Sequence, residues 1–474
     1  MNTKNMTIKE IQEALKNGGT SCREIVSNYQ KVIEEKNNGI NAYLEVFDDA
    51  FATAEDQDKK IASGEMLKPL TGAVFAIKDN ILIKGRVSSA SSKILENYHA
   101  AYDATVIKKL REAGAIFLGR TNMDEFAMGS STESSAFGVT KNPHDLRRVA
   151  GGSSGGSAAS VAMNSCVASL GTDTGGSIRQ PAAFCGVVGL KPTYGAVSRY
   201  GAIAMASSLD QIGPITKNVE DAETIFNIIK GKDLEDGTST SPEDIQKEIP
   251  AKLKIGVLKY DKEGVDGEVN KTIDSAVESL KKLGHEIVEV ELPLLKYSLP
   301  CYYIIMPAEV SSNLARYDGI RYGFSKDAGN LLDEYLESRG EGFGRETRRR
   351  VMLGTYVLSA GYYDAYYLKA QKVRALVKKD FQTIFNGENK VDAILLPTTP
   401  SPAFKIGEKT SDPVSMYLED IFTVSSNLAG IPAISVPAGL SKDGLPLSVQ
   451  FFAPWFREDI LFALGKQYEN TINS

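Results

Sequence analysis

The sequence predicts an α/β protein in which helices cover both faces of a β-sheet. Short apolar runs, of the kind found in buried strands, alternate with amphipathic helix patterns along much of the chain. The 474 residues are 42% hydrophobic and 24% charged, which is ordinary for a soluble globular enzyme with a large core. We expect one large domain over residues 1–474, with a helical insertion at about 290–390.

The N-terminal part, from Thr7 to about Ala62, predicts helices. Its apolar residues recur at the spacing of one helix face: Ile8, Ile11, Ala14 and Leu15, then Val26, Tyr29 and Val32. A strand is expected at 73–77 and a helix at about 104–113, with Asp103 as its cap and Gly114 as its end. A second strand follows at 116–118.

The middle of the chain continues the alternation. Small, largely apolar residues predict a buried helix at 158–163, and a buried strand follows at 166–170. Residues 231–252 are polar and acidic, as in a surface connection. We then expect a strand at 253–258, a helix ended by Gly284 and a strand at 286–292. The apolar face of that helix consists of Val269, Ile273, Ala276, Val277, Leu280 and Leu283.

The C-terminal part begins with tyrosine-rich helices at about 347–385. Three strands follow, at 393–396, 434–436 and 448–452. Asp443-Gly444 is a typical hairpin turn and is expected to join the last two of them.

Charge and cysteine usage indicate the class of partner and the compartment. A net charge of −6 gives no global basic surface for direct nucleic-acid binding, and the basic run Arg345–Arg350 is interpreted as a solvated helix face. The four cysteines have no C-x-x-C spacing, and we find no secretory leader and no membrane-spanning run. We therefore expect reduced thiols in a cytosolic protein.

Two glycine-flanked serine loops are the strongest functional signal. They are GGSSGG at 151–156 and DTGGS at 173–177, and glycine lets a ligand approach their backbone closely. A serine nucleophile needs a base, usually histidine, but the three histidines, His99, His144 and His285, lie outside glycine-rich segments. The best candidate base is Lys78, at the end of the apolar run 73–77.

Three other interpretations of these loops are weaker. A phosphate-binding loop fits the glycine spacing, but Ser157 stands where that motif has lysine. A G-x-S-x-G nucleophile elbow would centre on Ser154, but that fold also needs a downstream histidine. His285 precedes a strand-like run in an ordinary α/β region, which gives no indication of a catalytic histidine. Two purely structural turns are hard to reconcile with the presence of a second serine loop and a candidate lysine.

The loops resemble the core signature of the amidase signature family. The matching segments are GGSSGGSA at 151–158 and GTDTGGSIRQPA at 171–182, and AIKDN at 76–80 resembles the family's lysine motif. The resemblance implies a large mixed β-sheet between layers of α-helices, with the core signature at 70–215. It also implies a Ser–Ser–Lys triad, in which Ser177 is the nucleophile, Ser153 in a cis peptide is the bridge and Lys78 is the base.

These residues suit amide hydrolysis. A lysine acts as a base only when neutral, and burial lowers its pKa from about 10.4 toward neutrality. Ser153 can relay the proton, because a hydroxyl both donates and accepts. The backbone N–H groups of Thr174, Gly175, Gly176 and Ser177 are candidates for an oxyanion hole. Asp173 and Arg179 either pair to hold the loop or are two separate surface charges.

Further segments resemble one branch of the family, found in aspartyl/glutamyl-tRNA amidotransferases. They are MDEFAMGS at 123–130, KPTYG at 191–195 and GYYDAYY at 361–367, whereas His144 and Ala150 depart from the branch pattern beside the first loop. The resemblance implies that the chain hydrolyses glutamine and passes ammonia to a B subunit, which contacts tRNA and amidates Glu-tRNA or Asp-tRNA with ATP and Mg²⁺. With a small C subunit, the two form a heterotrimer, and this chain itself needs no cofactor or metal.

Free glutamine presents a carboxylate and an ammonium group, which call for a cation and an anion in the pocket. The resemblance assigns these roles to Arg350 and Asp420, with Tyr302 and the turn Met128-Gly129-Ser130 nearby. Two alternatives stay open. One is a free-standing amidase for another small amide, and the other is an amidase-like scaffold that only binds partners.

Overall fold

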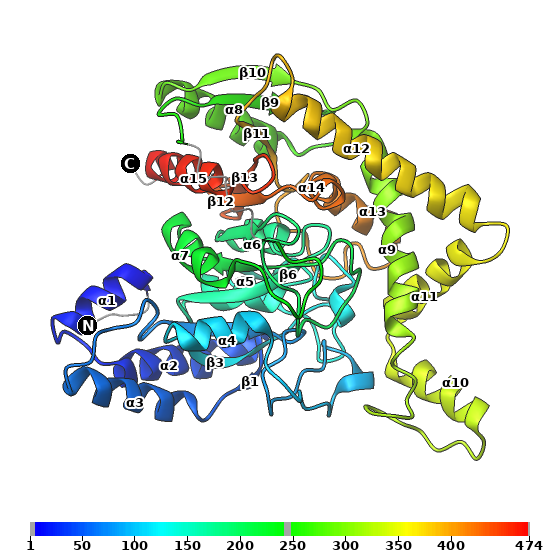
Figure 1. Cartoon of the computed structure of the whole chain (residues 1–474), viewed down its shortest axis with the longest axis horizontal. Helices are drawn as coiled ribbons and strands as arrows, with labels where there is room; N and C mark the ends of the chain where they lie inside the picture. Colours follow the sequence, from blue (N-terminus) through cyan, green and yellow to red (C-terminus); the bar gives the residue numbers. More distant parts are fainter. Residues whose placement is uncertain (1–4, 241–247, 473–474) are drawn as a thin grey trace.

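The computed structural model describes residues 5–240 and 248–472, and within them eleven strands form one sheet (Figure 1). A separate hairpin joins β4 (Lys141–Asn142) to β5 (Asp145–Val149). The spatial order of the large sheet is β1 (Tyr43–Val46), β3 (Ile116–Thr121), β2 (Val74–Lys78), β6 (Ala168–Asp173), β8 (Gln211–Thr216), β7 (Val188–Lys191), β12 (Ala433–Leu440), β13 (Pro446–Phe452), β11 (Ala393–Pro397), β9 (Lys254–Leu258) and β10 (Glu286–Val290).

The sheet is mixed, as expected. Strand β2 is parallel to β3 and β6, and β9 is parallel to β10 and β11, whereas the other neighbouring strands are antiparallel. Parallel strands bring their C-terminal ends to the same edge of a sheet, where ligands bind in open α/β folds. Lys78 ends β2 and Asp173 ends β6, so the lysine and the second serine loop start from one edge.

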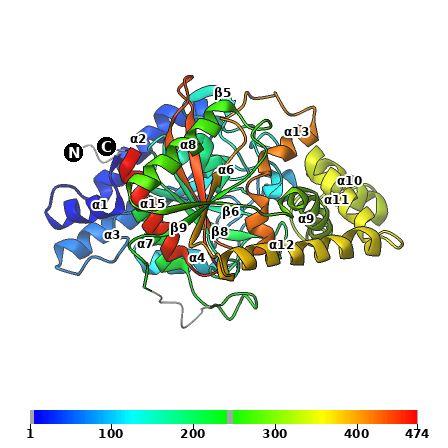
Figure 2. The same ribbon diagram turned by 90° about the horizontal axis from the view of Figure 1, so that it is seen from above.

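Helices cover both faces of the sheet (Figure 2), which confirms the predicted fold class. On one face lie α7 (Val219–Ile229), α8 (Gly267–Lys282) and α15 (Glu458–Ile472), and α5 (Gly155–Ala162) and α6 (Arg179–Cys185) pack against the other. The helices α1 (Ile8–Lys16), α2 (Cys22–Ile40), α3 (Ala50–Ala62) and α4 (Thr105–Glu112) lie beside β1 and β3 (Figure 1). The core side chains of β2, Phe75 and Ile77, are fully buried between these layers.

A helical region follows β10 and lies to one side of the sheet (Figure 1). It contains α9 (Ser298–Leu314), α10 (Leu331–Gly342), α11 (Arg345–Leu358), a π-helical segment at Tyr363–Leu368 and α12 (Lys369–Asn386). Helices α9 and α11 pack closely at Gly354, which has no side chain in the way: a Cβ there would lie 1.8 Å from the Pro307 carbonyl oxygen. Two short helices, α13 (Pro413–Tyr417) and α14 (Val424–Ala429), connect β11 to β12. That this region is an insertion into a single domain stays a prediction.

Several local predictions were wrong. Residues 7–62 are not helical throughout, because β1 interrupts the helices and pairs antiparallel with β3. Asp103 does not cap α4: Ala104 holds the N-cap position, while the Asp103 carboxylate accepts a hydrogen bond from the Lys84 amide at 2.8 Å. Leu283 lies just beyond α8 and is 39% exposed. The predicted tyrosine-rich helices at about 347–385 are present as α11, the π-helical segment and α12, but residues 359–362 lie between helices, where Gly361 has a φ of +85°.

Other predictions are confirmed. The apolar faces of α1 and α2 are buried, Gly114 and Gly284 end their helices with positive φ, and β12 pairs antiparallel with β13. All four cysteines are free and buried. The expected surface connection at 231–252 lies partly outside the described residues. Within the described ranges, every helix is too short or too polar to cross a bilayer.

Candidate active site

Lys78 lies at the centre of a buried hydroxyl cluster. Its Nζ donates hydrogen bonds to Ser153 Oγ at 2.8 Å, Ser154 Oγ at 2.7 Å and Thr172 Oγ1 at 2.9 Å. The side chain is fully buried, and this burial lowers the pKa of the lysine to about 7, against the opposing charges of Asp124, Asp173 and Asp210. Near neutral pH, a large fraction of Lys78 is therefore neutral and able to accept a proton.

Ser153 is held by the first glycine loop, between β5 and α5. The Gly152–Ser153 peptide bond is cis. Gly152 is required sterically, because a Cβ there would lie 2.0 Å from Asp124 Oδ2 and 2.6 Å from the Ser131 nitrogen. The loop thus reaches Lys78 only by passing directly against the Asp124 carboxylate.

Ser177 is held by the second loop, between β6 and α6. It is 8% exposed, whereas Ser153 and Ser154 are fully buried, so Ser177 is the serine that a ligand meets first. The Ser154 amide donates to the Ser177 carbonyl at 3.1 Å and ties the two loops together. Among the described residues, however, no hydrogen bond joins the Ser153 and Ser177 side chains.

The oxyanion prediction needs one correction. The Gly176 N–H donates to Asp173 Oδ1 at 2.8 Å, so this amide is already used within the loop. The amides of Thr174, Gly175 and Ser177 remain candidates. Gly175 also permits a close contact, because a Cβ there would lie 2.6 Å from the ring of Tyr302.

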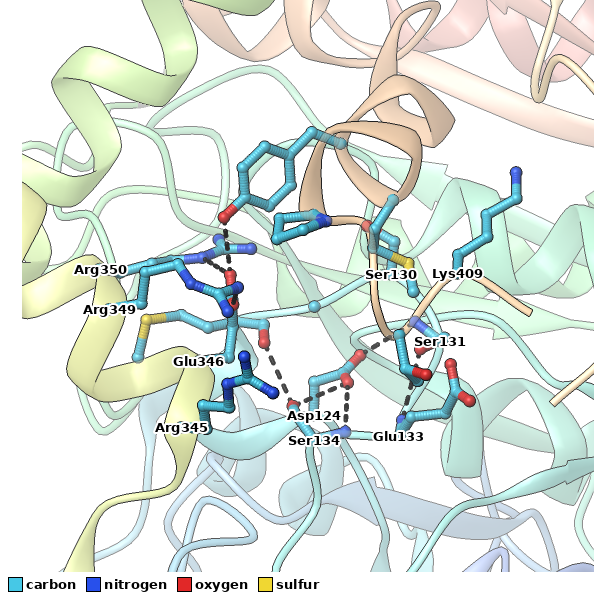
Figure 3. Close-up of a pocket in the computed structure, with 16 residues that line it drawn as sticks. Asp124, Ser130, Ser131, Glu133, Ser134, Arg345, Glu346, Arg349, Arg350 and Lys409 are labelled. Atoms are coloured by element: carbon cyan, nitrogen blue, oxygen red, sulfur yellow. Dashed lines mark hydrogen bonds and ion pairs between the residues drawn. The ribbon is translucent and has the colours of Figure 1, made fainter. Parts of the chain in front are cut away.

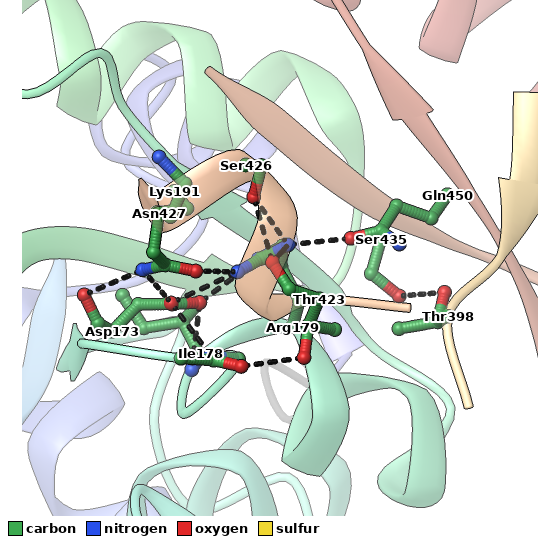
Figure 4. A network of polar contacts seen from close by, with 12 residues as sticks. Asp173, Ile178, Arg179, Lys191, Thr398, Thr423, Ser426, Asn427, Ser435 and Gln450 are labelled. Atoms are coloured by element: carbon green, nitrogen blue, oxygen red, sulfur yellow. Dashed lines mark hydrogen bonds and ion pairs between the residues drawn. The ribbon is translucent and has the colours of Figure 1, made fainter. Parts of the chain in front are cut away.

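Asp173 and Arg179 are a buried ion pair and not two separate surface charges (Figure 4). Arg179 Nε lies 2.9 Å from Asp173 Oδ2, and neither side chain is exposed. Burial is the largest single effect and raises the pKa of Asp173, but the charge and hydrogen bonds of Arg179, the charge of Lys191 and the hydrogen bond from Asn427 together lower the pKa to about 2. The rest of the guanidinium bonds to Ser426 Oγ, Gln450 Oε1 and Asn427 Oδ1, at 2.9, 2.7 and 2.7 Å. The nucleophile loop is thereby fixed to α14 and β13.

A cavity of about 330 Å³ is lined in part by Asp124, whose carboxylate lies against Gly152 of the first serine loop, but the residues of the two serine loops are not among its lining residues (Figure 3). Its wall includes four predicted pocket residues, Met128, Gly129, Ser130 and Arg350. Arg350 is 3% exposed, its Nε donates to Glu346 Oε1 at 2.8 Å, and its Cζ lies 5.5 and 5.4 Å from the ring centres of Tyr303 and Tyr417. The cavity thus has a fixed cation in its wall.

Asp420 and Tyr302 lie at the edge of this arrangement. Asp420 Oδ1 accepts from Ser130 Oγ at 3.0 Å, and Oδ2 accepts from the Tyr303 hydroxyl at 2.9 Å. Burial raises the pKa of Asp420 to about 7, although both hydrogen bonds and Arg350 favour the ionised form. Tyr302 contacts the Ser177 loop at Gly175 and does not line the cavity, but its ring packs on Tyr303, which stacks on Tyr417 in the cavity wall.

Sequence reasoning missed several residues that build the site. Ser154 and Thr172 share Lys78 with Ser153, and neither was assigned a role in catalysis. Asp124 accepts from the amides of Ser131 and Thr132, at 3.3 and 2.9 Å, and shapes the turn after Gly129. The available signal for Asp124 was its place inside the MDEFAMGS segment. Among the described residues, no group of three or more metal-ligating side chains is arranged to hold an ion.

Comparisons with known proteins identify the family of this chain. A family model described as Amidase matches residues 24–462. The curated Glutamyl-tRNA(Gln) amidotransferase A subunit of Carboxydothermus hydrogenoformans is 56% identical, covering 98% of this chain and 96% of that protein. The protein of the same name from Fusobacterium nucleatum is 52% identical, with coverages of 98% and 96%.

Solved structures give the same result. The crystal structure of the Glutamyl-tRNA(Gln) amidotransferase A subunit from Thermotoga maritima has a TM-score of 0.78 and is 42% identical, covering 99% of this chain and 94% of that chain. The native peptide amidase from Stenotrophomonas maltophilia has a TM-score of 0.83 and is 28% identical, with coverages of 99% and 97%.

Proposed function

This chain belongs to the amidase family, and from that premise we propose that it hydrolyses the side-chain amide of glutamine and supplies the ammonia for tRNA-dependent amidation. The observation that carries the proposal is Lys78: a fully buried lysine with a pKa near 7 whose Nζ lies 2.8 Å from the Ser153 hydroxyl. A buried base hydrogen-bonded to one serine, with a second serine on the adjoining loop, is the arrangement that covalent amide hydrolysis requires.

The proposed reaction begins with two coupled proton transfers. Ser177 Oγ attacks the amide carbon while its proton passes to Ser153 and the Ser153 proton passes to neutral Lys78. The Ser153 and Ser177 hydroxyls come within hydrogen-bond reach in the substrate complex, where catalytic contacts tighten. The amides of Thr174, Gly175 and Ser177 stabilise the oxyanion.

Collapse of this intermediate breaks the carbon–nitrogen bond. Lys78 returns its proton through Ser153 to the leaving nitrogen, and ammonia departs, leaving a glutamyl ester on Ser177. A water molecule, deprotonated by the same route, attacks the ester and releases glutamate, and Ser177 regains its proton. Both halves use the same base and the same oxyanion donors, so no further catalytic group is required.

Glutamine selectivity is assigned to charges around the cavity. We propose that Arg350 binds the α-carboxylate and that Asp420 binds the α-ammonium group, with the Met128-Gly129-Ser130 turn in the cavity wall and Tyr302 nearby, against the Ser177 loop. A bound ammonium group favours the ionised form of Asp420, so substrate binding lowers a pKa that burial has raised to about 7.

The names of the relatives support a role inside a larger enzyme. We propose that this chain works in the cytoplasm as the A subunit of a heterotrimer that also contains B and C subunits. The B subunit, with ATP and Mg²⁺, is proposed to amidate misacylated Glu-tRNA(Gln), Asp-tRNA(Asn) or both, and to make the main contact with tRNA.

The test is ammonia release from glutamine by the purified complex. Arg350→Ala and Asp420→Ala are expected to raise the KM for glutamine strongly, while hydrolysis of a simple amide without α-charges changes little. Equal losses on both amides would contradict the assigned pocket. Wild-type hydrolysis of the simple amide without any hydrolysis of glutamine would instead support a free-standing amidase.

A further inference from the structure

A second, much smaller cavity lies beside the Lys78 cluster. Its volume is about 10 Å³, close to the space that one water molecule needs. Its wall includes Asn80, Thr172, Thr174, Asp210 and Gln211, which come from the ends of β2, β6 and β8. The cavity is separate from the 330 Å³ cavity that Ser130 and Arg350 line.

Two side-chain oxygens of this wall lack a hydrogen-bond donor among the described residues: Asn80 Oδ1 and Gln211 Oε1. Both residues are almost fully buried, at 2% and 1% exposure. Their nitrogens are engaged, because Asn80 Nδ2 donates to Thr172 Oγ1 at 3.1 Å and Gln211 Nε2 donates to the Asp210 carbonyl at 2.6 Å. Buried acceptors that stay unpaired are costly, so a donor is needed at both oxygens.

Thr172 supplies the complementary group. Its Oγ1 accepts from Lys78 Nζ at 2.9 Å and from Asn80 Nδ2 at 3.1 Å. With two donors on its oxygen, the Thr172 hydroxyl has its own hydrogen left to give to a third group. The wall therefore presents two acceptors and one donor, which a single water molecule satisfies with two hydrogens and one lone pair.

The charges of the wall favour a neutral molecule over an ion. Asp210 contributes a carboxylate, which already accepts from Thr174 Oγ1 at 2.7 Å and from the Met205 amide at 2.9 Å. Arg199 contributes a guanidinium, which is paired with Asp236 at 3.0 Å. The Arg199 charge is thus already balanced by Asp236, and the Asp210 carboxylate is already engaged by Thr174 and the Met205 amide, so neither group is free to bind an ion in the cavity.

We propose that this cavity binds one ordered water molecule, held by Asn80 Oδ1, Gln211 Oε1 and the Thr172 hydroxyl, and that the water positions Thr172 for Lys78. The water connects the ends of three strands and fixes the hydroxyl that supports the lysine. Its effect on rate rests on the proposed function of Lys78 as the base, whereas its presence does not.

The first test is a crystal structure of the wild-type protein at a resolution that shows single waters, from crystals grown without ammonium salts. One peak is expected within about 2.7–3.2 Å of both amide oxygens. The Gln211→Met variant removes one acceptor with little change of shape, and the peak is expected to disappear. An empty wild-type cavity would overturn the proposal, as would density found only with ammonium present. The proposal would also be overturned if the side-chain amides of Asn80 and Gln211 are found rotated so that protein groups donate to their oxygens.

The second test is kinetic and uses the glutamine assay. Gln211→Met is expected to lower kcat about fivefold, the equivalent of one lost hydrogen bond, with KM unchanged. Gln211→Glu is expected to restore both the water and the rate, because its buried carboxyl stays protonated. Thr216→Val is the matched control, since it removes a buried hydroxyl at the other end of β8.

The outcomes separate the water from the proposed function. An equal fall in kcat for Gln211→Met and Thr216→Val would overturn the positioning role, as would unchanged kinetics after the peak is lost. If Gln211→Met does not fold, the crystal structure of Gln211→Glu decides: a retained water peak supports the proposal, and a lost peak overturns it. A wild-type protein that holds the water but does not hydrolyse glutamine would contradict the proposed function while leaving the water site established.

Discussion

At the residue scale, the chemistry depends on how Lys78 is paired. Among the described residues, its Nζ contacts three hydroxyls and the Thr172 carbonyl oxygen but no carboxylate, so burial outweighs the more distant acidic groups and lowers its pKa to about 7. A carboxylate in contact would instead stabilise the ammonium form and remove the base. The hydroxyl cluster therefore supplies hydrogen bonds to a buried lysine without raising its pKa as a carboxylate would.

Replacing Lys78 by arginine is expected to abolish glutamine hydrolysis. Arginine keeps the positive charge and can donate hydrogen bonds, but it stays protonated at any working pH and cannot accept the Ser153 proton. Steady-state ammonia release should fall by several orders of magnitude, and the same fall is expected for Lys78→Ala. Near-wild-type activity in Lys78→Arg would mean that the lysine acts only through its charge.

The pH dependence follows from two groups. Lys78 must be neutral and Asp420 must be ionised, and both have a pKa near 7 in the free protein, so kcat/KM for glutamine should rise with pH through about 7. For a simple amide without an α-ammonium group, only the Lys78 ionisation should remain. A profile that is flat between about pH 6 and 8 for both substrates would contradict the assignment.

The sequence identified some site residues better than others, for physical reasons. The glycine-flanked loops and Lys78 stand out as local patterns, whereas the roles of Ser153 and Ser177 were predicted from the resemblance of their segments to the family signature. The contacts of Ser154 and Thr172 with Lys78 depend on the parallel register of β2 and β6, which no local pattern contains. Within the basic run 345–350, Arg350 is buried while Arg348 is exposed, and only the packing of α11 decides which arginine faces the cavity.

At the element scale, the second serine loop depends on one buried ion pair. Asp173 ends β6, Arg179 begins α6, and the guanidinium extends the contact to α14 and β13. Local patterns did predict most strands near the site. They missed β7 and β8, which are buried along their whole length, and β1, whose four residues are too few to show an alternating pattern. They also missed α6, because its seven residues are all buried.

Arg179→Met is expected to destabilise the protein by about 3–5 kcal/mol, because it leaves the Asp173 carboxylate buried without a partner. Denaturant unfolding measures this change. Arg23→Met is the control, since the Arg23–Glu55 pair has side chains 65% and 47% exposed and its loss should cost less than about 1 kcal/mol.

The pH dependence of that difference has a definite sign. The pKa of Asp173 falls from 3.8 to about 2 on folding, so the pair's contribution is present above about pH 4 and is lost as the pH falls toward 2. The stability gap between wild type and Arg179→Met should shrink across this window. A gap that stays constant would show that the pair does not provide the stability.

At the scale of the whole molecule, the net charge of this chain agrees with the proposal that another subunit makes the main contact with tRNA. A chain with a net charge of −6 gains little from releasing counterions of a polyanion, so the isolated chain should not bind tRNA tightly at physiological salt. Filter binding or fluorescence anisotropy with misacylated tRNA measures this affinity. Nanomolar binding by the isolated chain would contradict a role limited to supplying ammonia.

The most direct test of the central claim is to identify the serine that forms the covalent intermediate. The complex is mixed with glutamine, quenched in acid and digested, and the peptides are mapped by mass spectrometry. The glutamyl adduct is expected on the peptide that contains Ser177, and it should be absent in Ser177→Ala and in Lys78→Ala. An adduct on Ser153, Ser154 or Cys185, or one that persists in Ser177→Ala, would contradict the account.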